Sequence, residues 1–169
     1  MVNCCKKNTK NTKDQLMVVN MVTIEQEQKR RKAKNVILFG VKESSKENVD
    51  DMKKEDENCV FNVLKAIGKE DIKPTFIKRI KSKKLNIPGP ILVELPNEAD
   101  RNPVLASAKK LAKSEYKDVY ISPDLTEAER LLEYELRTER NKLNQSLEQS
   151  SPFRYGIRNN QIIRINKNK

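Results

Sequence analysis

The sequence predicts an α+β fold, and three observations lead to that class. Four short apolar runs have the length and composition of strands. Two stretches between them carry apolar residues at helical spacing, and turn residues separate these elements. The chain has 169 residues, of which 36 % are hydrophobic and 35 % charged, so a modest core is expected.

The first half of this pattern begins with an apolar run, Val-Ile-Leu-Phe-Gly-Val at 36–41, that predicts a buried strand. Residues 42–58 hold four basic and seven acidic side chains, and we expect a charged loop there. Apolar residues then recur at helical spacing from Cys59 to Ile67 and stop at Gly68. A glycine just past the last apolar position indicates the end of a helix.

The second half repeats the pattern with a further strand. Strands are predicted at 75–80 and 90–95, the latter closed by Pro96. Asn102-Pro103 has the form of an N-cap followed by proline at the first helical position, and a fourth strand is predicted at 118–121. The order β-α-β-β-α-β over about 90 residues is the ferredoxin-like split βαβ arrangement, which RRM-like domains share.

The C-terminal part predicts a helix and a β-hairpin. Thr126 and Glu129 form a capping box, and the helix that it opens is expected to reach about Gln145. Two strands, at 155–158 and 161–165, flank a pair of asparagines that suits the positive φ angles of a tight turn.

Three regions follow from these elements. Residues 1–33 are predicted to be a basic arm, disordered or partly helical, that could be the remnant of a coiled coil. Residues 34–124 form the RRM-like domain, and residues 125–169 form a small helix-plus-hairpin domain.

The composition excludes several kinds of chemistry. The chain has no histidine, which removes Ser-His-Asp catalysis and histidine-ligated zinc. Its three cysteines form no Cys-x-x-Cys pair, and no glycine-rich phosphate loop or recognisable catalytic carboxylate pair is present. The apolar cluster 16–24 is too short to span a bilayer. We therefore expect no enzyme, no cofactor, no metal, no membrane partner and no small-molecule substrate.

The net charge of +11 points instead to a polyanionic partner. Residues 72–84 carry six basic side chains and no acidic one, at a position that the fold assigns to the loop between the second and third strands. A solvated lysine-rich loop is the alternative interpretation. A second basic cluster, at 29–32, has the composition of a nuclear-localisation or phosphate-binding patch, or of the charged end of a helix.

The third strand does not have the aromatic residues of a standard RNA-recognition sheet. Residues 88–95 read Pro-Gly-Pro-Ile-Leu-Val-Glu-Leu, where that signature places aromatics at several positions. Strand alternation leaves Phe39 and Tyr120 as the aromatics of the open face. Tyr120 is a candidate nucleic-acid contact and Phe39 a candidate stacking residue; the alternative is that the C-terminal helix or a partner covers this face.

Several segments also resemble one known family. Lys-Asn-Val-Ile-Leu-Phe-Gly-Val-Lys-Glu at 34–43, Ile-Leu-Val-Glu-Leu-Pro at 91–96, Ala-Ser-Ala-Lys-Lys-Leu at 106–111 and Val-Tyr-Ile-Ser-Pro-Asp-Leu-Thr at 119–126 are similar to the first-open-reading-frame proteins of LINE-type retrotransposons. The resemblance covers about residues 34–166. It implies a nucleic-acid chaperone that coats its element's RNA, and both domains of such a chaperone contact the strand. The implied location is a cytoplasmic ribonucleoprotein, with the nucleus as a second location.

By position, the resemblance assigns basic contact residues to three elements. These are Lys78, Arg79, Lys81, Lys83 and Lys84 around the second and third strands, Lys109 and Lys110 on the second helix, and Arg154, Arg158 and Arg164 on the hairpin. The expected partner is single-stranded RNA or DNA, bound mainly through phosphates. The family's upstream coiled coil would make the chain a homo-oligomer, a trimer. The alternative function is a protein-interaction module that uses the apolar open face of the sheet.

Overall fold

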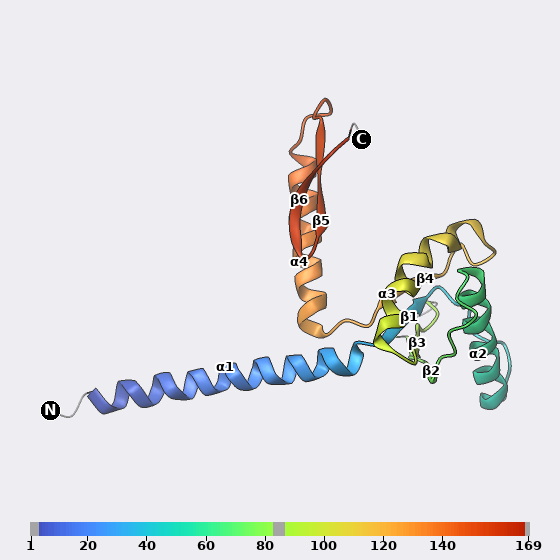
Figure 1. Ribbon diagram of the computed structural model, residues 1–169, viewed down its shortest axis with the longest axis horizontal. Coiled ribbons are helices and arrows are strands. Elements are labelled where there is room, and N and C mark those ends of the chain that lie inside the picture. The colour runs from blue at the N-terminus through green and yellow to red at the C-terminus, as the bar shows by residue number, and fades with distance from the viewer. Residues whose placement is uncertain (1–3, 83–86, 168–169) are drawn as a thin grey trace. The chain divides into compact units, whose positions relative to one another are not determined.

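The protein has a mixed α+β fold with antiparallel sheets, which confirms the predicted class. The computed structural model describes residues 4–82 and 87–167, and their side chains from residue 12 onward (Figure 1). The chain divides into two compact units. One consists of residues 26–124 and the other of residues 1–25 together with 125–169.

The N-terminal arm is helical. Helix α1 runs from Cys4 to Lys32 without interruption, and no glycine or proline occurs within it. Its apolar side chains are exposed, among them Leu16, Val19 and Val22. The absence of helix-breaking residues explains why a low-complexity segment that suggested disorder adopts this conformation.

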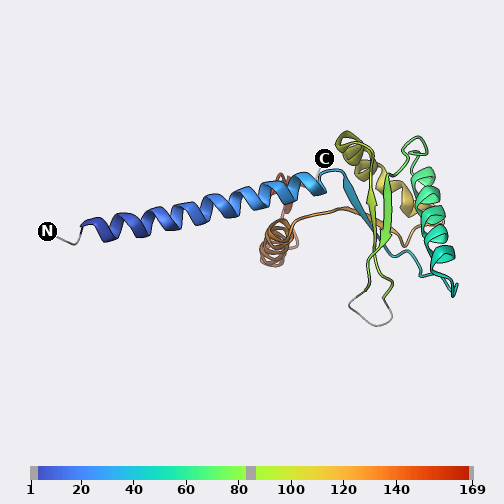
Figure 2. The same cartoon turned by 90° about the horizontal axis from the view of Figure 1, so that it is seen from below.

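In the unit 26–124 the elements follow in the order β1 (Asn35–Phe39), α2 (Val49–Ala66), β2 (Phe76–Arg79), β3 (Ile91–Glu94), α3 (Glu98–Ser107), the 3-10 helix η1 (Ala108–Lys113) and β4 (Tyr120–Pro123). The four strands form one sheet in the order β2-β3-β1-β4, and all three neighbouring pairs are antiparallel. Figure 2 views this sheet close to edge-on, with α2 along one side.

The core of this unit lies between the sheet and the helices. Val36 and Leu38 of β1 and Ile91 and Val93 of β3 are almost completely buried. They pack in one cluster with helix residues, including Val60, Val63, Leu64, Val104 and Leu111. Because side chains alternate along a strand, the residues between them point to the opposite, open face.

Two helices begin earlier than the sequence pattern predicts. Helix α2 starts after Asn48, whose side chain accepts a hydrogen bond from the N–H of Asp50, so residues 49–58 are helical and not the expected loop. The acidic residues Asp50 and Asp51 in the first turn stabilise this helix start, because they lie at the positive end of the helix dipole. Helix α3 starts after Asn97, and Pro103 lies inside it and not at its first position.

The described turns use glycine where the backbone demands it. Gly40 ends β1 at a φ of +82°, and a Cβ there would lie 2.1 Å from the carbonyl oxygen of Asp118. Gly68 follows α2 at a φ of +73°, which confirms the predicted end of that helix.

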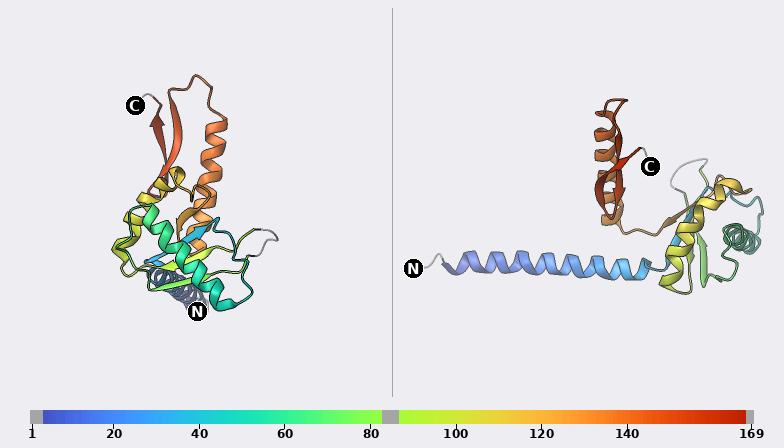
Figure 3. Two further views of the ribbon diagram at one scale, coloured as in Figure 1. Left: turned by 90° about the vertical axis from the view of Figure 1, so that its right-hand side faces the viewer. Right: turned by 45° about the horizontal axis from the view of Figure 1, so that its top comes forward.

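The C-terminal segment contains α4 (Glu127–Gln145), β5 (Phe153–Arg158) and β6 (Gln161–Asn166). The predicted capping box is present at Thr126 and Glu129. Asn159 and Asn160 have φ angles of 50° and 55°, so the predicted turn is confirmed. The hairpin lies alongside α4 (Figure 3), where the amide of Asn144 bonds both the N–H and the C=O of Tyr155.

Candidate nucleic-acid interface

The two candidate aromatic residues are direct neighbours on the open face of the sheet. Phe39 at the end of β1 lies opposite Tyr120 at the start of β4 in the antiparallel register. Their side chains are 44 % and 66 % exposed. Opposite residues in such a pair have Cβ atoms about 5 Å apart, so two exposed aromatic side chains leave the sheet from neighbouring positions.

The register extends this pair into a row across the sheet. Ile80, just after β2, donates its N–H to the carbonyl oxygen of Pro90 at 2.7 Å. In the β1–β3 register Leu38 lies opposite Ile91. One residue further along both antiparallel strands, Pro90 lies opposite Phe39. Ile80, Pro90, Phe39 and Tyr120 therefore form one apolar row, which we call the aromatic row.

The next row on the open face is mixed. It contains Lys78, Leu92, Ile37 and Ser122, which lie opposite one another across the four strands. Lys78 is exposed, whereas Ile37 at the centre is only 7 % exposed. This row places one cation, Lys78, on the same face as the aromatic row, on the strand that leads to Ile80.

The far end of the open face carries acidic groups whose charges are balanced. Glu94 lies 2.7 Å from the Nζ of Lys34, and Asp124 lies 2.6 Å from the Nζ of Lys32. Asn35 also donates to Asp124. The hydrogen bond from Lys34 is the main reason that the pKa of Glu94 is lowered. Along its strands, the face therefore runs from an apolar end to a charged end.

Of the candidate lysines that follow β2, the structure describes Lys81, next to the apolar end. Lys81 is exposed and directly follows Ile80 of the aromatic row. Lys83 and Lys84 lie outside the described residues. Lys78, in the neighbouring row, and Lys81, after Ile80, are therefore the described cations of this segment near the aromatic row.

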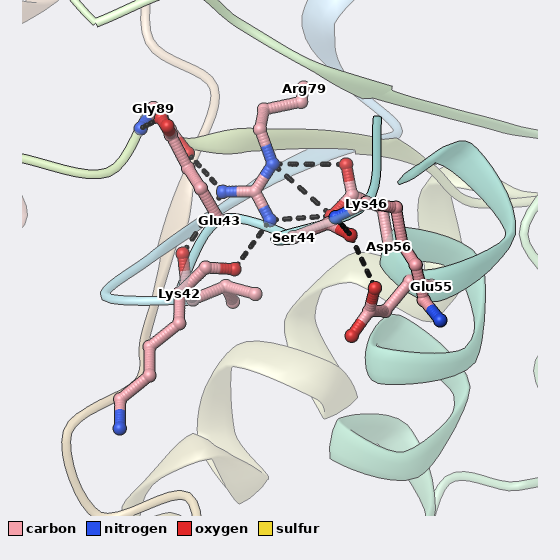
Figure 4. Close-up of polar contacts among 9 residues, drawn as sticks. Lys42, Glu43, Ser44, Lys46, Glu55, Asp56, Arg79 and Gly89 are labelled. Carbon is pink, nitrogen blue, oxygen red and sulfur yellow. Dashed lines mark hydrogen bonds and ion pairs between the residues drawn. The ribbon is translucent and has the colours of Figure 1, made fainter. Parts of the chain in front are cut away.

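Arg79 points away from these residues, into the helix layer (Figure 4). It forms an ion pair with Asp56 of α2, and the two side chains are only 16 % and 12 % exposed. Its Nη1 group also donates to the carbonyl oxygens of Val41 and Gly89. A phosphate contact would have to compete with these bonds, so we leave Arg79 out of the proposed contact set.

Lys109 and Lys110 belong to the helix side of the unit. Both lie in η1 and are exposed. The Nζ of Lys110 donates to the carbonyl oxygen of Ile67, the residue that caps α2, at 3.0 Å. Leu111, also in η1, belongs to the core on the helix side of the sheet. The two lysines are therefore not on the face that carries Phe39 and Tyr120.

The three candidate arginines of the hairpin occupy two different faces. Register places Arg154 opposite Ile165 and Arg158 opposite Gln161, whereas Arg164 lies opposite Tyr155. Alternation therefore puts Arg154 and Arg158 on one face and Arg164 on the other. The guanidinium of Arg164 lies 5.0 Å from the ring centroid of Phe153, a cation–π contact.

Sequence reasoning did not identify the orientation of β2. Phe76 and Ile80 are 48 % and 42 % exposed, because Ile77 and Arg79 face the helices instead. One signal in the sequence points to this orientation: Asp56 lies at helical spacing from Val60 and Val63, on the buried side of α2. A buried carboxylate needs a cation, and Arg79 supplies it.

Two further groups near α2 have raised pKa values. Burial is the largest cause for the Cys59 thiol, with the nearby Arg79 partly opposing it, and burial also raises the pKa of Tyr116. Both residues line a cavity of about 330 Å³ that also contains Gly40, Glu115 and Asp118. The Cys59 thiol is thus protonated at neutral pH.

The comparisons with known proteins do not identify the chain: neither a scan of protein-family models nor a search of curated proteins found a match. Among the described side chains, no group of three or more His, Cys, Asp or Glu residues could hold a metal ion. No described helix has the length and apolar character needed to cross a membrane. The function is therefore inferred from the geometry of the open sheet face.

Proposed function

We propose that this chain binds single-stranded nucleic acid, RNA in the first place, on the open face of its four-stranded sheet. The observation that carries the proposal is the exposed neighbouring pair Phe39 and Tyr120. Aromatic side chains stack on bases of any identity, and a base must be unpaired to reach them. Binding is therefore single-strand-selective and tolerant of sequence.

The charge distribution supports a defined path for the strand. Lys78 and Lys81 stand near the aromatic row, where phosphates of a stacked strand would pass. Glu94 and Asp124 lie at the opposite end of the face, each paired with a lysine, so their carboxylates would compete with phosphates for those lysines. The strand crosses the sheet along the aromatic row and avoids that end.

We further propose that the unit is an RRM-like, ferredoxin-like domain. The element order and the strand order β2-β3-β1-β4 support this assignment. The stacking positions differ from the usual ones, because the aromatics lie at the end of β1 and the start of β4 and none lies in β3.

The resemblance to LINE-type first-open-reading-frame proteins supports a wider role, a nucleic-acid chaperone of a retrotransposon ribonucleoprotein. Arg154, Arg158 and Arg164 add phosphate contacts in the C-terminal segment, where their guanidinium groups are exposed. The exposed apolar residues of α1 between Leu16 and Ile24 support self-association of the chain. The location that follows is a cytoplasmic or nuclear ribonucleoprotein.

The test is fluorescence anisotropy with a labelled 30-nucleotide RNA at rising salt. Phosphate-driven binding to a single strand weakens with a log–log slope of about −0.7 for each neutralised phosphate. Phe39→Ala and Tyr120→Ala should each weaken binding by about 5- to 150-fold, which corresponds to about 1–3 kcal/mol for each stacked base.

Phe76→Ala is the matched control, because Phe76 is as exposed as Phe39 and lies on the same face, opposite Glu94 at the charged end. We expect little change for this variant. A wild-type affinity that does not respond to salt, or equal losses for Phe39→Ala and Phe76→Ala, would refute binding along the aromatic row.

A protein-interaction module is the second candidate function. Ile37 and Leu92 continue the apolar character of the face beyond Phe39, and this observation favours it. Leu92→Asp separates the two candidates: a docked protein should be lost, whereas RNA binding through the aromatic row and the lysines should largely survive. Competition with unlabelled duplex RNA provides the second arm, since stacking requires unpaired bases.

A further inference from the structure

The guanidinium group of Arg79 is fully committed inside the unit 26–124. Nε and Nη2 donate to the carboxylate of Asp56, with the Nη2–Oδ1 distance at 2.5 Å. Nη2 also donates to the carbonyl oxygen of Lys42, at 3.1 Å. Nη1 donates to the carbonyl oxygens of Val41 and Gly89, at 3.0 and 2.9 Å. These contacts account for all five N–H groups that an arginine possesses.

The acceptors come from two separate backbone segments and from one helix. Val41 and Lys42 belong to the segment that leaves β1, Asp56 to α2, and Gly89 to the segment that enters β3 (Figure 4). Ile80 and Pro90 close the base of the β2–β3 connection with a 2.7 Å hydrogen bond. Packing there is tight, because a Cβ on Gly89 would lie 2.1 Å from the carbonyl oxygen of Ile80. Arg79 thus fixes both ends of this connection against α2.

We propose that Arg79, held by Asp56, is a positioning residue for the nucleic-acid site. Because side chains alternate along β2, an inward Arg79 forces Lys78 and Ile80 outward, onto the open face. A slip of one residue in the β2–β3 register would turn Arg79 outward and Lys78 and Ile80 inward. The buried ion pair opposes that slip, since Arg79 would lose Asp56 and all its carbonyl partners. The inference rests on the proposed function, because it assigns Lys78 to the phosphates.

The opposite role for Arg79 is direct contact with phosphate, and Asp56→Asn distinguishes the two by sign. The substitution keeps the size of the side chain and removes its charge. If Arg79 binds phosphate, loss of the competing carboxylate frees it, and RNA affinity rises. If Arg79 positions its neighbours, a looser Arg79 releases β2, and RNA affinity falls.

Under the proposal, Asp56→Asn weakens binding of the 30-nucleotide RNA by about tenfold or more at fixed salt. The log–log salt slope also becomes shallower, by about 0.7, because the Lys78–phosphate contact is lost. A change that only lowered stability would leave the slope of the folded protein unchanged. Circular dichroism and urea unfolding establish that the variant is folded at the temperature of the assay.

Asp124→Asn is the matched control. Asp124 also pairs with a single cation, Lys32, in the same unit, and its side chain is 12 % exposed, like that of Asp56. It lies at the charged end of the sheet, away from the aromatic row, so we expect no loss of RNA affinity and no change of slope.

Arg79→Lys supplies a second variant if Asp56→Asn does not fold. Lysine keeps the charge but cannot replace five planar donors. If Arg79 is a positioning residue, we therefore expect weaker RNA binding and a shallower log–log salt slope. Direct phosphate contact expects the slope to persist. In the Asp56→Asn or Arg79→Lys background, Lys78→Met should lower RNA affinity less than it does in the wild type, because Lys78 is no longer held on the open face.

The outcomes distinguish the proposed function from the positioning role of Arg79. Wild-type protein that does not bind RNA in a salt-dependent way refutes the proposed function itself. Wild-type binding with Asp56→Asn indistinguishable from Asp124→Asn refutes only the positioning role. A rise in affinity for Asp56→Asn also overturns it and assigns Arg79 to the phosphates.

Discussion

The unit 26–124 and the C-terminal segment 125–169 are stabilised in different ways. All the buried hydrophobic side chains of the described chain lie in the first, where strands β1 and β3 pack on α2, α3 and η1. Helix α4 contains no buried residue, and among the described residues 125–167 only Thr126 is buried. The first region depends on contacts between residues far apart in sequence, and the second on caps, turns and backbone hydrogen bonds.

This difference has a consequence for function. A site on the sheet is rigid because a packed core supports it, and stacking needs such a platform. The arginines of the hairpin stand on two strands, β5 and β6, that contain no fully buried residue, so they suit adaptable phosphate contacts. Under the proposed function, the two regions divide binding between stacking and charge.

The largest expected effect comes from matched leucine truncations in the two regions. Leu64→Ala removes a side chain that is 2 % exposed and should lower the free energy of unfolding by about 2–5 kcal/mol. Leu143→Ala, on the half-buried face of α4, should cost clearly less. Urea unfolding measures both, and equal losses would show that 125–169 has a core of the same quality.

The second effect concerns the bonds between α4 and the hairpin. Asn144→Leu removes both hydrogen bonds to Tyr155 and leaves its backbone groups without a partner, at a cost of about 1–3 kcal/mol. Asn144→Asp keeps the acceptor and should cost less. Amide hydrogen exchange of β5 reports the loss, and unchanged protection in Asn144→Leu would contradict this role.

A third effect tests the turn. Asn160 has a φ of 55°, which glycine adopts without strain, so Asn160→Gly should stabilise the hairpin by a few tenths to about 1 kcal/mol. Asn160→Val should destabilise it by about 1–2 kcal/mol. Thermal unfolding of β5 and β6 followed by NMR provides the measurement; the same sign for both variants would be inconsistent with this turn.

The smallest effect is the pH dependence of the Lys34–Glu94 pair. The pKa of Glu94 is lowered from 4.5, so the folded state holds its proton less tightly than the unfolded state does. The stabilisation is therefore present above about pH 4.5 and is lost as the pH falls through the lowered value. The difference in urea midpoint between wild type and Lys34→Met should shrink from pH 7 to pH 3; a constant difference would contradict the assignment.

Local signals in the sequence predicted caps and turns well. The capping box at Thr126, the turn at Asn159-Asn160 and the stop at Gly68 depend only on the residue and its near neighbours. Helix starts were less accurate where competing signals existed. The acidic residues at 49–58 indicated a loop by charge, and in the structure they favour the first turns of α2.

The candidate site was predictable only in part. Phe39 and Tyr120 followed from strand alternation, because each stands beside residues that are clearly apolar on the core side. Phe76, Ile80 and Arg79 did not, since residues 75–80 read equally well with either face inward. Likewise, the split of Arg154 and Arg158 from Arg164 needs the register of the hairpin.

The sequence by itself determined the fold class, most element positions, the net charge of +11 and the absence of histidine. These are properties of composition and of short-range pattern. Only the tertiary structure decided which face of β2 is buried and that Asp56, not a ligand, holds Arg79. The reason is physical: a buried cation is stable only where a partner from another element meets it, and the chain reveals that partner only when folded.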